Sequence, residues 1–209
     1  MWLAFYNNEG IGDVLLLTSG NVADDKVKTA TKDNVTVIYD EDTDEAVSVN
    51  LFNVAEKLGL EGNGALALST EQVKQVNEII AAAGFDLTIE VDNSPKFVVG
   101  YVEECRPHED SDHLSVTQIR VSDDKVLQIV CGARNISKGL NVLVALPGAV
   151  MPSGLIIWPG ELRGVVSNGM VCSTRELELT HIEDYPGIWE LAKDLKVGTP
   201  LSEVVEYYA

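Results

Sequence analysis

From Pro95 onward, short apolar segments recur every ten to fifteen residues, with Gly and Pro turns between them. Alternating apolar and polar residues in such short segments indicate β-strands, because successive side chains of a strand point to opposite faces. Five strands with no long helix between them predict a small all-β barrel of the OB-fold type. The strands are expected at residues 97–103, 114–121, 126–131, 141–146 and 155–158 continuing into 162–165.

The chain before Ser94 mixes strand and helix patterns. Residues 1–17 are apolar and aromatic, and a turn at 7–10 divides them into a predicted hairpin. Residues 35–39 and 46–52 alternate apolar and polar side chains on either side of a charged turn, which predicts a second hairpin. Residues 87–91 add an expected strand.

Two helices are expected in the same region. Asn53 is placed to cap a short helix that ends at Gly59, and apolar residues recur at helical spacing from Thr70 until Gly84. These elements predict a small α+β domain over residues 1–94. Residues 92–95 form the expected linker, and residues 95–209 form the second domain.

The charge is strongly negative and unevenly distributed. The chain has a net charge of −18; residues 1–94 hold 5 Lys+Arg against 17 Asp+Glu, and residues 95–209 hold 10 against 16. The net charges are therefore −12 and −6. Nucleic-acid binders usually carry a positive excess, so any binding of RNA must depend on a few local cations.

The residues give no indication of an enzyme. Cys105, Cys131 and Cys172 are widely spaced and lack a CxxC pair, which argues against disulfides and cysteine zinc sites. Cys105, His108 and His113 are close in sequence but lack the ligand set or the base of a reactive site. We expect no cofactor, no metal and no catalytic residue.

We also expect a cytoplasmic protein without a membrane segment. No apolar run approaches the roughly 20 residues that a bilayer-spanning helix needs. The first ten residues lack the charged start and cleavage site of a signal peptide.

Three ordered motifs in the second domain resemble a known family. Residues 99–102 and 106–114 are similar to its first strand and following loop, and residues 127–136 resemble its Ile-Val-Cys-Gly-Ala-Pro-Asn motif. Residues 162–173 match Leu-Arg-Gly-Val-Glu-Ser-x-Gly-Met-Leu-Cys-Ser almost throughout. The motifs resemble the tRNA-binding domain of the bacterial phenylalanyl-tRNA synthetase β subunit. With the acidic domain in front, the chain resembles YtpR-like tRNA-binding proteins of low-GC Gram-positive bacteria.

The resemblance implies non-catalytic binding of tRNA by the barrel. Cations near the motifs can neutralise phosphate, amides and hydroxyls can bond ribose or base edges, and a thioether can contact a base. The sequence departs from the family at two places: Arg134 replaces a common proline, and His113 replaces a cation. The candidate RNA-binding residues are Arg134, Asn135, Lys138, Arg163, Ser167, Asn168 and Met170.

Each type of candidate also has a structural alternative. Asn135 could cap the turn after Gly132, Ser167 could cap the end of the barrel, and Met170 could fill the core. Arg163 could be an ordinary exposed charge. At the level of the whole chain, the alternative is an adaptor whose acidic first domain docks a protein partner and whose barrel has lost strong RNA affinity. Related modules also allow a homodimer.

Overall fold

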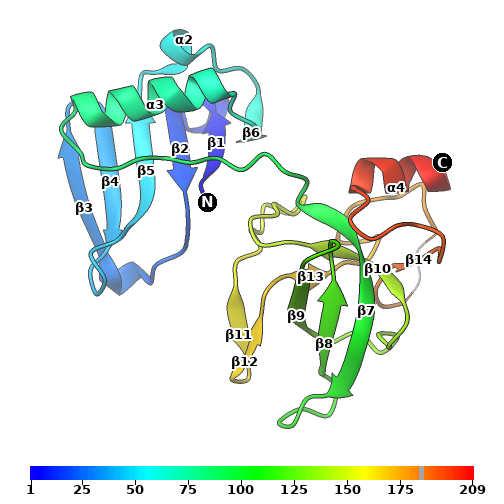
Figure 1. The fold of residues 1–209 in the computed structure, drawn as a ribbon. Helices are drawn as coiled ribbons and strands as arrows, with labels where there is room; N and C mark the ends of the chain where they lie inside the picture. The colour runs from blue at the N-terminus through cyan, green and yellow to red at the C-terminus, as the bar shows by residue number, and fades with distance from the viewer. Residues whose placement is uncertain (184–185) are drawn as a thin grey trace. The chain divides into compact units, whose positions relative to one another are not determined.

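The computed structural model describes residues 1–183 and 186–209. The chain divides into two compact units, Met1–Ser94 and Pro95–Ala209 (Figure 1). Each unit has a hydrophobic core of its own. In the described ranges, no helix is both long enough and apolar enough to span a bilayer.

The first unit is built on a six-stranded antiparallel sheet with strand order β3-β4-β5-β2-β1-β6. Both predicted hairpins are present, β1 with β2 and β4 with β5. The two edge strands, β3 and β6, were not predicted, because their mostly exposed residues lack an alternating apolar pattern. The strands are β1 (Leu3–Asn7), β2 (Val14–Thr18), β3 (Val27–Lys32), β4 (Val35–Asp40), β5 (Ala46–Phe52) and β6 (Asn63–Leu66).

Helix α3 (Thr70–Ala82) lies across one face of this sheet (Figure 1). The Ser69 side chain accepts from the backbone N–H of Gln72, and the Gln72 side chain accepts from that of Ser69, so a capping box begins the helix. Gly84, at a φ of 79°, follows the end of the helix as predicted. The buried side of α3 packs into the core of the unit through Val76, Ile79 and Ile80.

Short helices occupy the remaining turns. Helix α2 (Ala55–Leu58) ends at Gly59 in the left-handed conformation, as predicted, but Asn53 does not cap it. The Asp13 carboxylate accepts from the backbone N–H groups of Val54 and Ala55 instead, at 3.3 and 3.0 Å. The expected strand at 87–91 is reduced to a single bridge at Val91. Helix α1 (Asn8–Ile11) and the 3₁₀ turn η1 (Asp24–Lys26) complete the unit.

The second unit is a nearly closed antiparallel barrel, which confirms the OB-fold expectation. Its strand order is β13-β10-β7-β8-β9, and β12 runs beside β9, where the Asn168 N–H donates to the Gln128 carbonyl at 2.8 Å. The strands are β7 (Phe97–Pro107), β8 (Ser115–Arg120), β9 (Val126–Cys131), β10 (Asn141–Ala145), β11 (Gly160–Leu162), β12 (Val165–Ser167), β13 (Met170–Val171) and β14 (Glu190–Leu191).

The first four predicted strands of the barrel are confirmed, and the fifth was wrong in its first part, residues 155–158; its continuation, 162–165, spans the facing ends of β11 and β12 and the turn between them. Residues 155–158 form a single bridge, between Val150 and Ile156, rather than a strand. The Ile157 N–H donates to the Ala149 carbonyl, which holds this segment in a turned loop. Strand β13 pairs with β10, and β12, which pairs with β11, lies against β9 through the bond from the Val130 N–H to the Ser167 hydroxyl.

Two apolar clusters stabilise the barrel: one fills its interior, and the other packs between the outer surface of its strands and the segments that cover them. Val102, Ile119 and Ile129 are fully buried within the barrel. Outside, Trp189 packs with the C-terminal helix α4 (Leu201–Tyr208), which the sequence did not predict. Because β10 is buried along its whole length, both clusters depend on it.

Candidate nucleic-acid interface

Two loops at one end of the barrel are joined by side chains. The loop 108–114 connects β7 to β8, and the tip of the β11–β12 hairpin lies against it. His108 Nε2 is 3.2 Å from the Leu162 carbonyl, and Arg163 Nη1 donates to the Asp110 carbonyl at 2.6 Å. We call these residues, His108, Asp110, Leu162 and Arg163, the clasp. OB folds use the loops in these two positions to bind oligonucleotides.

The tautomer of His108 follows from its partners. The Asp110 N–H donates to Nδ1 at 3.0 Å, so Nδ1 carries no proton and Nε2 donates to Leu162. Only 3% of His108 is exposed. The ring therefore acts as a buried cross-link between the two loops, a role that the sequence did not indicate.

Arg163 lies in a turn and not in the strand where the sequence placed it. Arg163 and Gly164 have φ values of 48° and 76°, and they connect the directly paired Leu162 and Val165. Two positive φ angles in a two-residue hairpin loop are typical of a type I′ turn, which matches the twist of the strands. The turn presents an exposed guanidinium, one N–H of which is used by the clasp.

The loop 132–139 follows β9 and carries three of the candidate residues. Arg134 and Lys138 are exposed. Asn135 joins the loop to a distant segment: its amide oxygen accepts from the Ile188 N–H at 3.0 Å, and its nitrogen donates to the Ile188 carbonyl and to Glu190. Asn135 therefore holds two loops together through long-range bonds rather than by capping its own turn.

Ser167 and Asn168 lie where β12 approaches β9. The Ser167 hydroxyl accepts from the Val130 N–H at 3.1 Å and donates to the Gly169 carbonyl at 3.3 Å, and only 5% of the residue is exposed. Asn168 is half-buried. Ser167 thus supplies a hydrogen bond that closes the barrel.

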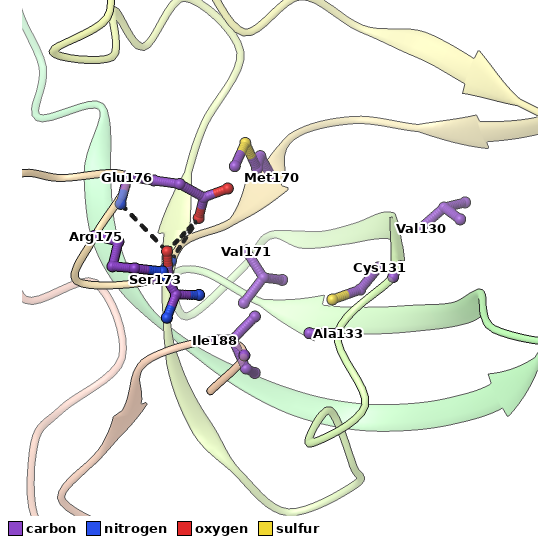
Figure 2. A pocket seen from close by; sticks show the side chains of 11 residues that line it. Val130, Cys131, Ala133, Met170, Val171, Ser173, Arg175, Glu176 and Ile188 are labelled. Carbon is purple, nitrogen blue, oxygen red and sulfur yellow. Dashed lines mark hydrogen bonds between the residues drawn. The ribbon is translucent and has the colours of Figure 1, made fainter. Parts of the chain in front are cut away.

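A pocket of about 340 Å³ opens beside these strands. Figure 2 shows its lining side chains, which come from three segments of the chain, residues 130–133, 170–176 and 187–188. Two of these parts belong to motifs that carry the family resemblance. We call the following residues the pocket: Val130, Cys131, Gly132, Ala133, Met170, Val171, Ser173, Arg175, Glu176, Gly187 and Ile188.

A charged side chain is fixed at the exposed mouth of the pocket. Glu176 Oε2 accepts from the Ser173 N–H at 2.8 Å and from the Ser173 hydroxyl at 2.7 Å, while Ser173 Oγ accepts from the Glu176 N–H (Figure 2). This reciprocal bonding is a capping box around the turn 173–176. Glu176 was not among the residues predicted from the sequence, although the Ser-x-x-Glu spacing of a capping box signals it.

The two thiols beside the pocket are held in the neutral form. Burial, and then the negative charge of Glu176, raise the pKa of Cys172 to about 12. Burial is also the main cause of the raised pKa of Cys131. A thiol must lose its proton to act as a nucleophile, so both groups behave as apolar wall atoms at neutral pH.

The barrel unit carries exposed cations despite its negative total. Arg120 pairs with Glu103 at 2.7 Å. His113, which replaces a family cation, instead contacts Asp112 at 2.8 Å, and this hydrogen bond lowers the pKa of Asp112. Seven exposed Arg and Lys side chains of this unit form no ion pair with any residue that the structure describes, and these are Arg106, Lys125, Arg134, Lys138, Arg163, Lys193 and Lys196.

The predicted RNA-binding residues therefore do not form one cluster but lie at different sites of the barrel. Arg163 belongs to the clasp, Met170 lines the pocket, and Asn135 bonds Ile188, which also lines it. Their contacts with RNA stay predictions, as do those of the other candidates. Within residues 1–183 and 186–209, no three His, Cys, Asp or Glu side chains are grouped as a metal site would require.

Comparisons with known proteins match both units. Residues 97–200 match a domain family described as "Putative tRNA binding domain", and residues 22–92 match a domain family of unknown function. The phenylalanine–tRNA ligase β subunits of Rhodospirillum rubrum and Oceanobacillus iheyensis are 51% and 46% identical over 110 and 118 residues. These matches cover 52% and 54% of this chain but only 13% and 14% of the ligase subunits.

One relative matches along almost the whole chain. "Putative tRNA-binding protein YtpR" of Bacillus subtilis (strain 168) is 45% identical over 195 residues. The match covers 93% of this chain and 96% of the relative, so it includes both units. With this identity and coverage, the chain belongs to the YtpR family.

Proposed function

We propose that the chain binds tRNA through its barrel and catalyses no reaction on it. The observation that carries the proposal is that residues 97–200, which match the tRNA-binding domain family, are the residues that build the nearly closed barrel. The name of the YtpR relative and the matches to ligase β subunits support the same function.

The exposed cations of the barrel are the proposed phosphate contacts. Arg134 and Lys138 project from the loop after β9, and Arg163 projects from the hairpin tip with guanidinium N–H groups beyond the one that the clasp uses. Arg can bond phosphate bidentately, whereas Lys acts as a point charge. Asn168 and Met170, both half-buried, are the proposed contacts to ribose or base.

Two of the predicted RNA-binding residues, Asn135 and Ser167, use their side chains mainly for hydrogen bonds within the protein. Asn135 uses both ends of its amide on residues 188 and 190, and Ser167 is buried with its hydroxyl used twice. We propose that they hold the RNA-contacting loops in place. Their substitution is then expected to weaken tRNA binding and to lower stability together.

The test is a filter-binding titration with bulk tRNA at low salt, repeated with Arg134→Ala and Arg163→Ala. We expect binding that weakens in each variant and falls steeply as salt is added, because released counterions drive phosphate contacts. Salt screens the negative charge of the protein over one Debye length, ~8 Å at physiological salt. The exposed cations must therefore contact phosphates within that distance. An absence of binding at micromolar protein and low salt would contradict the proposal.

The role of the first unit is a separate part of the proposal. With a net charge of −12 it repels RNA, so we propose that it contacts a basic protein, in the cytoplasm where tRNA is found. Recovery of one protein partner that survives RNase treatment would support this role. Light scattering would show whether the chain pairs as a homodimer.

A further inference from the structure

The pocket has the size and the walls of a site for one flat heterocycle. Its volume of about 340 Å³ is at the lower end of the ~300–1,000 Å³ range of small-molecule sites, so it suits a fragment rather than a large cofactor. Val130, Met170, Val171 and Ile188 supply apolar surface, and the neutral thiol of Cys131 adds a soft sulfur atom. Sulfur atoms make favourable contacts with aromatic rings.

The carboxylate of Glu176, at the mouth of the pocket, influences which chemical groups bind there. Glu176 turns Oε2 to Ser173, and Figure 2 shows the other carboxylate oxygen directed away from Ser173. In the described part of the chain, Oε1 accepts no hydrogen bond. A carboxylate oxygen is acceptor-only, so it repels phosphate and attracts N–H donors. Arg175, with the opposite charge, lines the pocket as well, so the carboxylate does not exclude phosphate by itself; what Oε1 adds is a preference for a base edge that carries an N–H donor.

The same oxygen distinguishes between bases. Cytosine, adenine and guanine each carry an exocyclic amino group that can donate to Oε1, as carboxylates do with the cytosine N4 amino group. Uracil has carbonyl oxygens at its exocyclic positions, and these would face the carboxylate unfavourably. Single-stranded RNA loops are recognised by splaying such bases out of the stack and bonding their edges.

We propose that the pocket binds one unpaired, amino-bearing base of tRNA, with Glu176 Oε1 accepting a hydrogen bond from its exocyclic amino group. This inference rests on the proposed tRNA-binding function and names the part of the RNA that the pocket receives. Phosphates on either side of the base remain outside. There the exposed Arg134 and Lys138 of the adjoining loop 132–139 neutralise them.

The experiment compares two single-stranded RNA hexamers, oligo(C) and oligo(U), on the full-length protein. Equal length gives both the same phosphate charge, so the difference in affinity reports on the base. We expect oligo(C) to bind about tenfold more tightly, from one hydrogen bond gained and one repulsion avoided.

The variant Glu176→Gln separates recognition from a structural role. Its amide oxygen can accept both bonds from Ser173, which leaves the amide NH₂ in the place of Oε1. That donor favours the carbonyl of uracil, so the preference for oligo(C) should vanish or reverse. Glu178→Gln is the matched control, because it removes the same charge two residues away and does not line the pocket. It should keep the preference of the wild type.

Methyl NMR gives a second readout. Titration of oligo(C) into protein with ¹³C-labelled methionine methyl groups should shift the Met170 signal, while Met151, which is 4% exposed and outside the pocket, serves as the reference. If tRNA binds but the hexamers show no base preference and the Met170 signal does not move, the pocket inference is wrong and the proposed function stands. If no RNA binds at all, both are wrong.

Discussion

The clasp and the pocket use their polar groups differently. In the clasp, His108 bonds at both ring nitrogens and Arg163 bonds a carbonyl, so the side chains mainly satisfy the protein itself. In the pocket, Ser173 occupies one oxygen of Glu176 while the other faces away from it. The clasp fixes the loops, and the pocket keeps an acceptor for a ligand.

This difference separates residues that shape an interface from residues that contact a ligand. Substitutions in the clasp should lower stability, with an effect on RNA binding that follows from looser loops. Substitutions of exposed groups near the pocket should alter RNA binding while the free energy of unfolding stays constant. The following four predictions test that division.

The largest expected effect is at a glycine that leads into the pocket. A Cβ at Gly169 would lie 2.8 Å from the Ala145 carbonyl oxygen, and its φ is 139°. Gly164, in the hairpin of the clasp, has a φ of 76° and open space around it. We expect Gly169→Ala to lower the free energy of unfolding by about 3 kcal/mol or more, and Gly164→Ala by about 1 kcal/mol.

Urea denaturation measures both changes. A Trp2→Phe background leaves Trp158 and Trp189, both in the second unit, as the fluorescent reporters. Equal losses at the two glycines would show that the barrel wall tolerates a methyl group beside Ala145, contrary to the close approach seen there.

The second prediction concerns the buried ring of the clasp. His108→Ala removes two hydrogen bonds and a side chain that is only 3% exposed, so the free energy of unfolding should fall by about 2 to 3 kcal/mol. Arg163→Ala removes one exposed hydrogen bond and should cost at most about 1 kcal/mol. The same fluorescence assay compares them. If Arg163→Ala costs as much as His108→Ala, the arginine and not the histidine holds the clasp.

The third prediction is a loss of stability at alkaline pH that depends on a thiol beside the pocket. The folded state raises the pKa of Cys172 from its ordinary value of 9.0 to about 12. Between these values the unfolded chain releases a proton that the folded chain retains. The contribution is therefore complete below pH 9 and falls by about 1.4 kcal/mol per pH unit above it.

Denaturation midpoints measured from pH 8 to pH 11 test this sign. Cys172→Ala should make the alkaline decline shallower than in the wild type, although the raised pKa of Cys131 keeps part of it. Identical slopes in the two proteins would mean that the Cys172 thiol is not buried in the way the structure describes.

The smallest effect on stability is expected from the exposed cations of the loop 132–139. Arg134→Gln and Lys138→Gln should each change the free energy of unfolding by less than about 0.5 kcal/mol. Each should also reduce the slope of log affinity for tRNA against log salt by about one. Glu178→Gln, which leaves every cation in place, serves as the control. A normal salt slope in both cation variants would place the phosphate contacts elsewhere.

Much of the barrel could be predicted because its strands are locally encoded. The first four strands alternate apolar and polar residues, and that pattern is a property of neighbours in the chain. The fifth was misplaced because the apolar residues 155–158 looked like a strand. Ile157 is buried in the outer apolar cluster instead, while the short β13 pairs with β10 and β12 lies against β9. Pairing with a distant strand, and not local pattern, decided between these segments.

The candidate site could be predicted only in part, for the same reason. The motif residues were found, but the uses of their side chains were not. Asn135 bonds residues 53 and 55 positions away, and His108 bonds Leu162 at a separation of 54. A single sequence gives no signal for such partners, because hydrogen bonds depend on distance in space.

By itself the sequence determined the periodicities that make the strands and helix α3, the uneven charge, and the motifs that resemble the YtpR family. Only the tertiary structure decided that Asp13, not Asn53, caps α2, and that Ser173 fixes Glu176 at the mouth of the pocket. Local patterns follow from covalent neighbours. Caps, clasps and pockets join groups from distant or differently oriented parts of the backbone, and these meet only when burial of the apolar faces brings them together.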